Sequence, residues 1–205
     1  MSAKRLAVLV VPVLVLVSSA LAQVNELSLT VGRTFVSTQT VPASGDPIHF
    51  GNPASLAVDY ARLLKTHKIF SLYAELPVAY VPRMDLNYYP GGIPEDIGAL
   101  FVTPSVRVNI FSGDSVTPWV SAGGGYGRFR ESSHLYYPDG PNPGPTGTNT
   151  GVVQAGGGLD VWFWHNWGAR VEARDYYSGV PSLNVDTGRS RQHNYYVGVG
   201  IIHRF

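Results

Sequence analysis

Alternate residues of this chain sort into two registers, one apolar and one that carries most of the charge. The last segment shows this best, because one register holds Tyr195, Val197, Val199, Ile201, His203 and Phe205, while the other holds Asn194, Tyr196, Gly198, Gly200, Ile202 and Arg204. Successive side chains of a β-strand point to opposite faces, so such a segment has one apolar and one polar face. The pattern recurs about eight times along the chain, which predicts an all-β protein of amphipathic strands.

The first 22 residues have the pattern of a secretory signal peptide. Lys4 and Arg5 precede an apolar run from Leu6 to Val17, and small residues lead up to Ala22. The apolar run is about a dozen residues long, whereas a membrane-spanning helix needs about 20. We therefore expect cleavage after Ala22, with residues 23–205 forming one mature domain. An uncleaved N-terminal anchor is the alternative.

Composition excludes several classes of function. A formal net charge of +1 gives no electrostatic basis for binding nucleic acid. The absence of cysteine excludes disulfides and thiolate chemistry. The six histidines are scattered and show no metal-ligand spacing, so we expect neither a metal site nor a cofactor.

The connections between the predicted strands alternate in length. We predict eight strands, at residues 26–37, 54–64, 69–81, 98–111, 116–130, 151–164, 167–177 and 191–205. The connections 38–53, 82–97, 131–149 and 178–190 are long, whereas 65–68, 112–115 and 165–166 are short. Bacterial membrane β-barrels have an even number of strands, short periplasmic turns and longer outer loops. A sheet in lipid must also close, because a free edge leaves its backbone unsatisfied. The sequence therefore predicts an eight-stranded antiparallel, up-and-down transmembrane β-barrel in an outer membrane.

In such a barrel the apolar register faces lipid and the charged register faces the lumen. Seven charged residues fall on the inward register: Asp59, Glu75, Arg107, Asp160, Arg170, Glu172 and Arg174. A barrel of about eight strands is just wide enough for side chains to fill it. Opposite charges should pair there, because an unpaired buried charge costs several kcal/mol. We interpret the seven residues as a structural network; a narrow ion or water path gated by these pairs is the alternative.

Aromatic residues gather near the predicted strand ends, which is typical of the interface girdles of membrane barrels. The predicted girdle comprises Trp119, Tyr126, Trp162, Phe163, Trp164, Trp167, Tyr176, Tyr177, Tyr195 and Phe205. Glycine-rich runs at 123–127 and 156–158 lack the lysine and the following helix of a phosphate-binding loop. In a barrel wall, such glycines make room for large neighbours in the lumen.

Three stretches resemble small outer-membrane β-barrels of the outer membrane protein A and X type: PWVSAGGGYGRF at 118–129, WGARVEARDYY at 167–177 and YYVGVGIIHRF at 195–205. The resemblance covers essentially the whole mature chain. It implies that Tyr195, Val197, Val199, Ile201, His203 and Phe205 form a C-terminal signal for the barrel-assembly machinery. The family includes adhesion, envelope-integrity and minor channel proteins. Because no peptidoglycan-binding domain follows Phe205, tethering to the cell wall is not expected.

These observations predict a monomeric, non-enzymatic protein of the Gram-negative outer membrane, in contact with outer-membrane lipids and lipopolysaccharide. Its long loops would meet the exterior, where recognition usually resides. The aromatic loop residues Tyr88, Tyr89, Tyr136 and Tyr137 are the candidate contacts.

Two alternatives stay open. The first is an enzyme that modifies lipid A, which needs a serine activated by a histidine and a carboxylate. Its candidates are Glu131, Ser132, Ser133 and His134, and His193 with Ser190 and Asp186, although neither set matches a known catalytic motif. The second is a soluble ligand-binding barrel with its faces reversed.

Overall fold

A computed structural model describes residues 24–111 and 115–205. The predicted leader, residues 1–22, and most of the predicted turn at 112–115 lie outside the described residues. Within the described ranges, no helix is long and apolar enough to cross a membrane.

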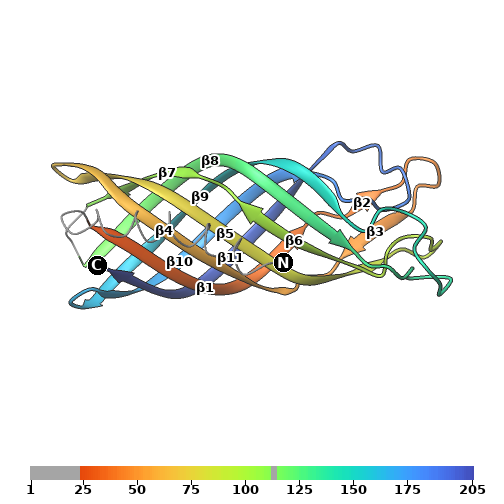
Figure 1. The fold of residues 1–205 in the computed structure, drawn as a ribbon, viewed down its shortest axis with the longest axis horizontal. Helices are drawn as coiled ribbons and strands as arrows, with labels where there is room; N and C mark the ends of the chain where they lie inside the picture. Colours follow the sequence, from red (N-terminus) through yellow and green to blue (C-terminus); the bar gives the residue numbers. More distant parts are fainter. Residues whose placement is uncertain (1–23, 112–114) are drawn as a thin grey trace, which may run out of the picture.

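The described chain folds into one antiparallel sheet that closes on itself (Figure 1). Its strands are β1 (Asn25–Val36), β2 (Gln39–Thr40), β3 (Pro47–Phe50), β4 (Ala54–His67), β5 (Phe70–Asn87), β6 (Asp96–Val102), β7 (Ser105–Ile110), β8 (Val116–Glu131), β9 (Thr148–Trp164), β10 (Trp167–Gly179) and β11 (Arg191–Arg204). The wall runs β5-β4-β1-β11-β10-β9-β8-β6, and pairing of β5 with β6 closes it.

β6 and β7 are two parts of one wall strand, since both pair with β5 on one side and with β8 on the other. The predicted single strand at 98–111 is interrupted at Thr103 and Pro104, because proline has no N–H to donate to the ladder. The register is the same on both sides of the break. With β2 and β3 belonging to a loop, eight strands form the wall, and the predicted fold is confirmed.

The two ends of the barrel differ as predicted. The tight turns after His67 and Trp164 lie at one end, whereas the long connections and the β2–β3 hairpin lie at the other (Figure 1). The backbones of Asn25 and Phe205 hydrogen-bond to each other in both directions, at 2.8 and 2.9 Å. Both ends of the described wall therefore lie on the short-turn side, which is the periplasmic side in this class.

The long-loop end is more structured than predicted. The connection 38–53, predicted as a loop, contains the hairpin β2–β3, whose second strand pairs with β5 at Asn87 and Leu86. β5 itself continues to Asn87, although its predicted end was residue 81. The barrel wall therefore extends further outward than the sequence suggested.

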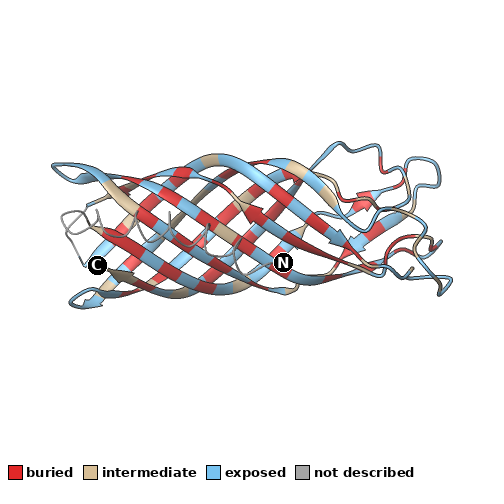
Figure 2. Cartoon of the chain, in the orientation of Figure 1, coloured by how far each residue is buried: buried red, intermediate tan, exposed pale blue. Residues whose placement is uncertain are grey.

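Burial alternates along every wall strand (Figure 2). The outward register is apolar over the central part of the wall; Val31 and Val199, for example, are each 54% exposed. Contiguous apolar surface on this scale marks contact with a membrane or a protein partner. The reversed, soluble barrel is therefore wrong.

Two aromatic residues of the predicted girdle are buried inside the barrel instead, and a third, Trp162, is half-buried on the inward register of β9. Trp119 is 2% exposed and Tyr176 is 1% exposed, and both sit on the inward register of their strands. Tyr176 stacks on Phe101, with ring centroids 5.0 Å apart. Both residues were assigned to the girdle because they lie near a strand end. The face that a side chain takes depends instead on its odd or even position along the strand.

The lumen has two layers. The layer towards the periplasmic end is polar and holds the predicted charges. The layer towards the long loops is an apolar core formed by inward wall residues together with residues of the loops, among them Phe101, Phe129, Val152, Ile48, Tyr88, Ile93 and Leu183.

Candidate functional site

The structure places all seven predicted lumen residues inside the barrel, none more than 4% exposed. Arg174 is the centre of the network. Its guanidinium donates to Glu172 at 2.8 Å, to Asp59 at 2.7 Å and to Glu75 at 2.9 Å, and it also reaches the hydroxyl of Ser121 at 3.0 Å. One arginine thus compensates three carboxylates that come from three different strands.

Arg170 forms the second group of contacts. Its Nε and Nη2 donate to the two carboxylate oxygens of Asp160 at 2.7 and 2.8 Å, which is the strong bidentate geometry of an arginine–carboxylate pair. Its Nη1 reaches Ser28 at 3.1 Å and Asp59 at 3.3 Å. Asp59 is therefore shared between Arg170 and the central Arg174.

The third group, nearest the periplasmic end, is built on Glu26. This carboxylate pairs with Arg107, accepts from Arg204 at 2.8 Å and accepts from the hydroxyl of Tyr73 at 3.2 Å. Arg107 in turn lies 3.8 Å from Glu75, which links this group to the centre. Glu26 is not among the seven predicted network residues, although it lies on the same register of β1 as the buried Ser28.

Trp119, predicted to lie in the aromatic girdle, is instead part of the polar layer of the lumen. Its ring lies 4.9 Å from the guanidinium carbons of both Arg170 and Arg174, and its Nε1 donates to Asp160 at 3.2 Å. A Cβ atom at Gly158 would lie 2.7 Å from Cζ2 of this ring. A Cβ atom at Gly156 would lie 2.7 Å from Cγ of Arg174. These glycines make room for lumen side chains, as the sequence predicted.

Large buried side chains of the polar layer and the apolar core occupy the described lumen. The largest fully buried side chains are wall residues that point inward: Trp119, Arg107, Arg170, Arg174, Tyr176, Tyr196, Phe101 and Phe129. Each guanidinium of the polar layer contacts a carboxylate, and the apolar core lies between this layer and the exterior.

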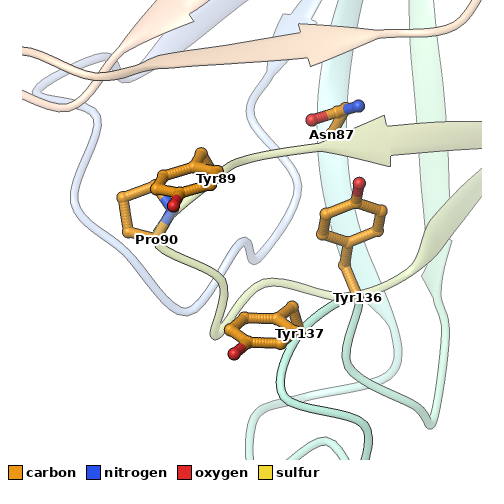
Figure 3. Close-up of a pocket in the computed structure, with 5 residues that line it drawn as sticks. All are labelled: Asn87, Tyr89, Pro90, Tyr136 and Tyr137. Atoms are coloured by element: carbon orange, nitrogen blue, oxygen red, sulfur yellow. The ribbon is translucent and has the colours of Figure 1, made fainter.

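A second candidate site lies among the outer loops (Figure 3). It is a cavity of about 700 Å³ lined by Asn87, Tyr89, Pro90, Tyr136 and Tyr137. In Figure 3 the rings of Tyr89 and Tyr137 are seen nearly edge-on with a space between them, and the hydroxyl of Tyr136 points towards Asn87. Its volume is within the range of small-molecule sites, about 300–1,000 Å³.

Three of the four predicted loop contacts line this cavity, whereas Tyr88 does not. Tyr88 is 4% exposed and belongs to the apolar core, so its assignment as a surface contact is wrong. Its neighbour Tyr89 is 92% exposed. Because β5 continues to Asn87, the two tyrosines that follow point to opposite sides.

The residues considered for catalysis are not brought together as a triad. His134 contacts Ser132 through its backbone N–H, at 3.2 Å, and not through its ring. Nδ1 of His193 lies 2.6 Å from Asp175, whereas Asp186 accepts from the backbone of its own loop at 2.7 Å. Among the described residues, neither imidazole ring forms a hydrogen bond with a serine hydroxyl. Within the same residues, no group of three potential metal ligands is found.

The residues of the predicted assembly signal line the outer wall of β11. Tyr195, Val197, Val199 and Ile201 are exposed on the lipid-facing register, and the ring of His203 lies 4.3 Å from that of Trp167. Phe205 is also exposed, and its ring stacks on His203 with centroids 5.9 Å apart. This face is therefore continuous with the apolar belt.

No protein-family model matches the chain, and no curated protein matches its sequence. Solved structures of small outer-membrane barrels do match. Neisserial surface protein A has a TM-score of 0.55 and 9% identity, over 88% of this chain and 97% of that one. OprG from Pseudomonas aeruginosa has a TM-score of 0.53 and 9% identity, over 89% of this chain and 95% of that one. Ail, the attachment invasion locus protein of Yersinia pestis, solved in complex with the heparin analogue sucrose octasulfate, has a TM-score of 0.51 and 14% identity, over 89% and 99%.

At these identities the likeness shows the fold, which is that of the small outer-membrane β-barrels. The predicted fold class is thereby confirmed. The apolar belt agrees with the location of these proteins, the outer membrane of Gram-negative bacteria.

Proposed function

We propose that this chain is a sealed, non-enzymatic outer-membrane barrel that recognises a partner outside the cell through its outer loops. The observation that carries the proposal is the tyrosine-lined cavity at the long-loop end, above a lumen that holds many large buried side chains. Loops on a rigid scaffold are where recognition usually resides.

Contacts between the loops support a preformed surface. Nδ2 of Asn184 donates to Asn142 at 2.7 Å and to the backbone of Gly92 at 3.2 Å, so three of the long connections meet there. Gln39 of the hairpin donates to Gln192 at the start of β11, at 2.8 Å. A surface that is already ordered loses less entropy on binding.

The lining of the cavity favours an uncharged saccharide. None of the five lining residues is charged, and the three tyrosines combine a flat apolar ring with a polar hydroxyl. Such rings pack against the C–H faces of sugars, while hydroxyl and amide groups hydrogen-bond sugar hydroxyls. Ail was solved with a sulfated sugar, sucrose octasulfate, but the cavity here lacks the cations that such a ligand needs.

The test is binding of the full chain, refolded into phosphatidylcholine nanodiscs, to an array of neutral and sulfated glycans. We expect binding to neutral glycans that is lost when Tyr89→Ala and Tyr137→Ala are combined. Phe111→Ala, which removes an exposed ring at the opposite end of the barrel, is the matched control and should bind normally. No glycan binding, or binding to sulfated glycans that ignores the tyrosine substitutions, would contradict the proposal.

We further propose that the barrel is monomeric and bears no nucleic-acid site. The lipid-facing register of β11 includes Val197, Val199 and Ile201. During assembly the barrel-assembly machinery would bind this face, which would contact the outer-membrane lipids after insertion. A chain with Val199→Asp should then accumulate outside the membrane fraction.

A further inference from the structure

The outward face of β8 changes character in a fixed order from the middle of the wall to the outer end. Val120 is apolar and exposed, Tyr126 follows on the same face, and the next two outward positions are Arg128 and Arg130. Tyrosine at this position marks the interface between hydrocarbon and headgroups, and its hydroxyl donates to Asn149 at 2.6 Å. A strand rises about 3.3 Å per residue and is tilted by about 40° in such barrels, so the arginines lie about 5 and 10 Å further outward, at headgroup level.

The two arginines line a groove on this outer wall. Its volume is about 170 Å³, and Tyr80, Pro82 and Gly98 are among the other lining residues. Gly98 pairs with Arg130, and a Cβ atom at Gly98 would lie 3.0 Å from the carbonyl oxygen of Pro82. The missing side chain therefore keeps the space beside the guanidinium groups open. The groove is smaller than a typical ligand site of about 300–1,000 Å³, which suits a single headgroup moiety.

Within residues 24–111 and 115–205, no hydrogen bond or ion pair engages the guanidinium of Arg128 or Arg130. The nearby Arg83 behaves differently, because it pairs with Asp85 at 2.9 Å and with Asp96 at 3.3 Å. The acidic side chains of this rim are thus already bound to Arg83. Neither guanidinium has a partner at salt-bridge distance, and Asp96, the carboxylate that interacts with Arg130 at longer range, is itself paired with Arg83.

We propose that Arg128 and Arg130 bind a phosphate on the headgroup of an outer-leaflet lipid, whose acyl chains then lie along Tyr80 and the apolar belt. Charge complementarity selects an anion, and the planar guanidinium group suits the oxygens of phosphate. The level of the groove in the membrane favours a lipid as the source of the phosphate, because the groove adjoins the apolar belt that contacts the acyl chains. The site lies on the outer wall and is distinct from the tyrosine cavity, which is lined by other residues.

Native mass spectrometry of the full chain in detergent, titrated with diphosphoryl lipid A and with fully dephosphorylated lipid A, tests the proposal. We expect tighter binding of the phosphorylated lipid. One basic residue near an anionic membrane surface typically raises the affinity for the lipid about fivefold. Arg128→Gln or Arg130→Gln should therefore weaken binding of the phosphorylated lipid about fivefold, and the double variant about 25-fold. The corresponding lysine variants keep the charge and should lose less. Retention of the gel-mobility shift on heating verifies that each variant is folded.

Arg33→Gln is the matched control, because Arg33 is also exposed on the outward register towards the outer end of β1 and donates to the backbone of Asn52 at 3.3 Å. It should leave the affinity within about twofold of the wild type, as for an ordinary surface substitution. Equal affinity for both forms of lipid A would overturn the proposal. An equal loss in the Arg33 variant would also overturn it, since net charge alone would then explain the effect. Full competition by millimolar inorganic phosphate would refute a lipid source.

Discussion

Removal of Arg174 should be the most destabilising single change in the polar layer of the lumen. The side chain is buried and contacts Glu172, Asp59 and Glu75 at 2.7–2.9 Å. After Arg174→Gln, Asp59 and Glu75 each keep a second arginine within 4 Å, whereas the hydrogen bond left to Glu172 among the described residues is that from the hydroxyl of Thr30, at 2.6 Å. One buried carboxylate thus loses its cation, a change that costs about 3–5 kcal/mol. We expect the free energy of unfolding to fall by that amount.

The measurement is urea unfolding of the chain in phosphatidylcholine vesicles, followed by tryptophan fluorescence and by gel mobility. Arg191→Gln, at an exposed arginine of β11, is the control and should stay within about 0.5 kcal/mol of the wild type. Combining Glu172→Gln with Arg174→Gln removes the stranded charge and should recover about 1–2 kcal/mol, since residues in one network couple. A loss below about 1 kcal/mol in Arg174→Gln, or strict additivity in the double variant, would refute the network as described.

Three further outcomes are expected. Gly158→Ala should cost about 1–3 kcal/mol in the same unfolding assay, because its methyl group would collide with the carbonyl oxygen of Val171 and with the ring of Trp119, whereas Gly151→Ala, which meets no atom within 4 Å, should be near neutral. Val199→Arg, midway between the aromatic residues of β11, should cost about 2–4 kcal/mol, and Tyr195→Arg near the interface about 0–1 kcal/mol; equal costs would contradict the assigned depth. The refolded chain in planar lipid bilayers should show no steady conductance, and a reproducible ohmic current would contradict a sealed lumen.

The wall of the barrel could be predicted from the sequence because one physical rule governs it. Because the wall has lipid outside and charged side chains inside, residue character alternates with a period of two. Whether a residue occupies an odd or an even position along its strand therefore determines whether its side chain faces lipid or the lumen. Arg170, Glu172 and Arg174 lie on one parity of β10 and are all buried, while Val171 between them is exposed. Parity also predicts that Trp119 faces the lumen, because it shares its register with the buried Ser121. Its proximity to a strand end was a weaker indication of where the side chain lies.

The outer end could not be predicted in the same way, because its structure depends on contacts between distant segments. β3 is only four residues long and exists because it pairs with the end of β5. The burial of Tyr88 and the exposure of Tyr89 follow from that extension. The tyrosine cavity joins residues 87–90 to residues 136–137, and no local pattern relates two loops so far apart in the chain.

The apolar and polar sides of β5 exchange at the point where the barrel wall leaves the membrane. Up to Tyr80 the outward side chains are apolar and the inward ones include Glu75. A bulge lies between Val81 and Met84; Arg83 within it and Asp85 beyond it are exposed, and the buried residues that follow are apolar. A strand leaving the bilayer meets water outside, so its apolar face must turn towards the lumen. This reversal explains why the alternation of outward apolar residues predicted an end at residue 81, whereas β5 continues to Asn87. It also explains why the lumen changes there from a charged layer to an apolar core, against which the outer loops are packed.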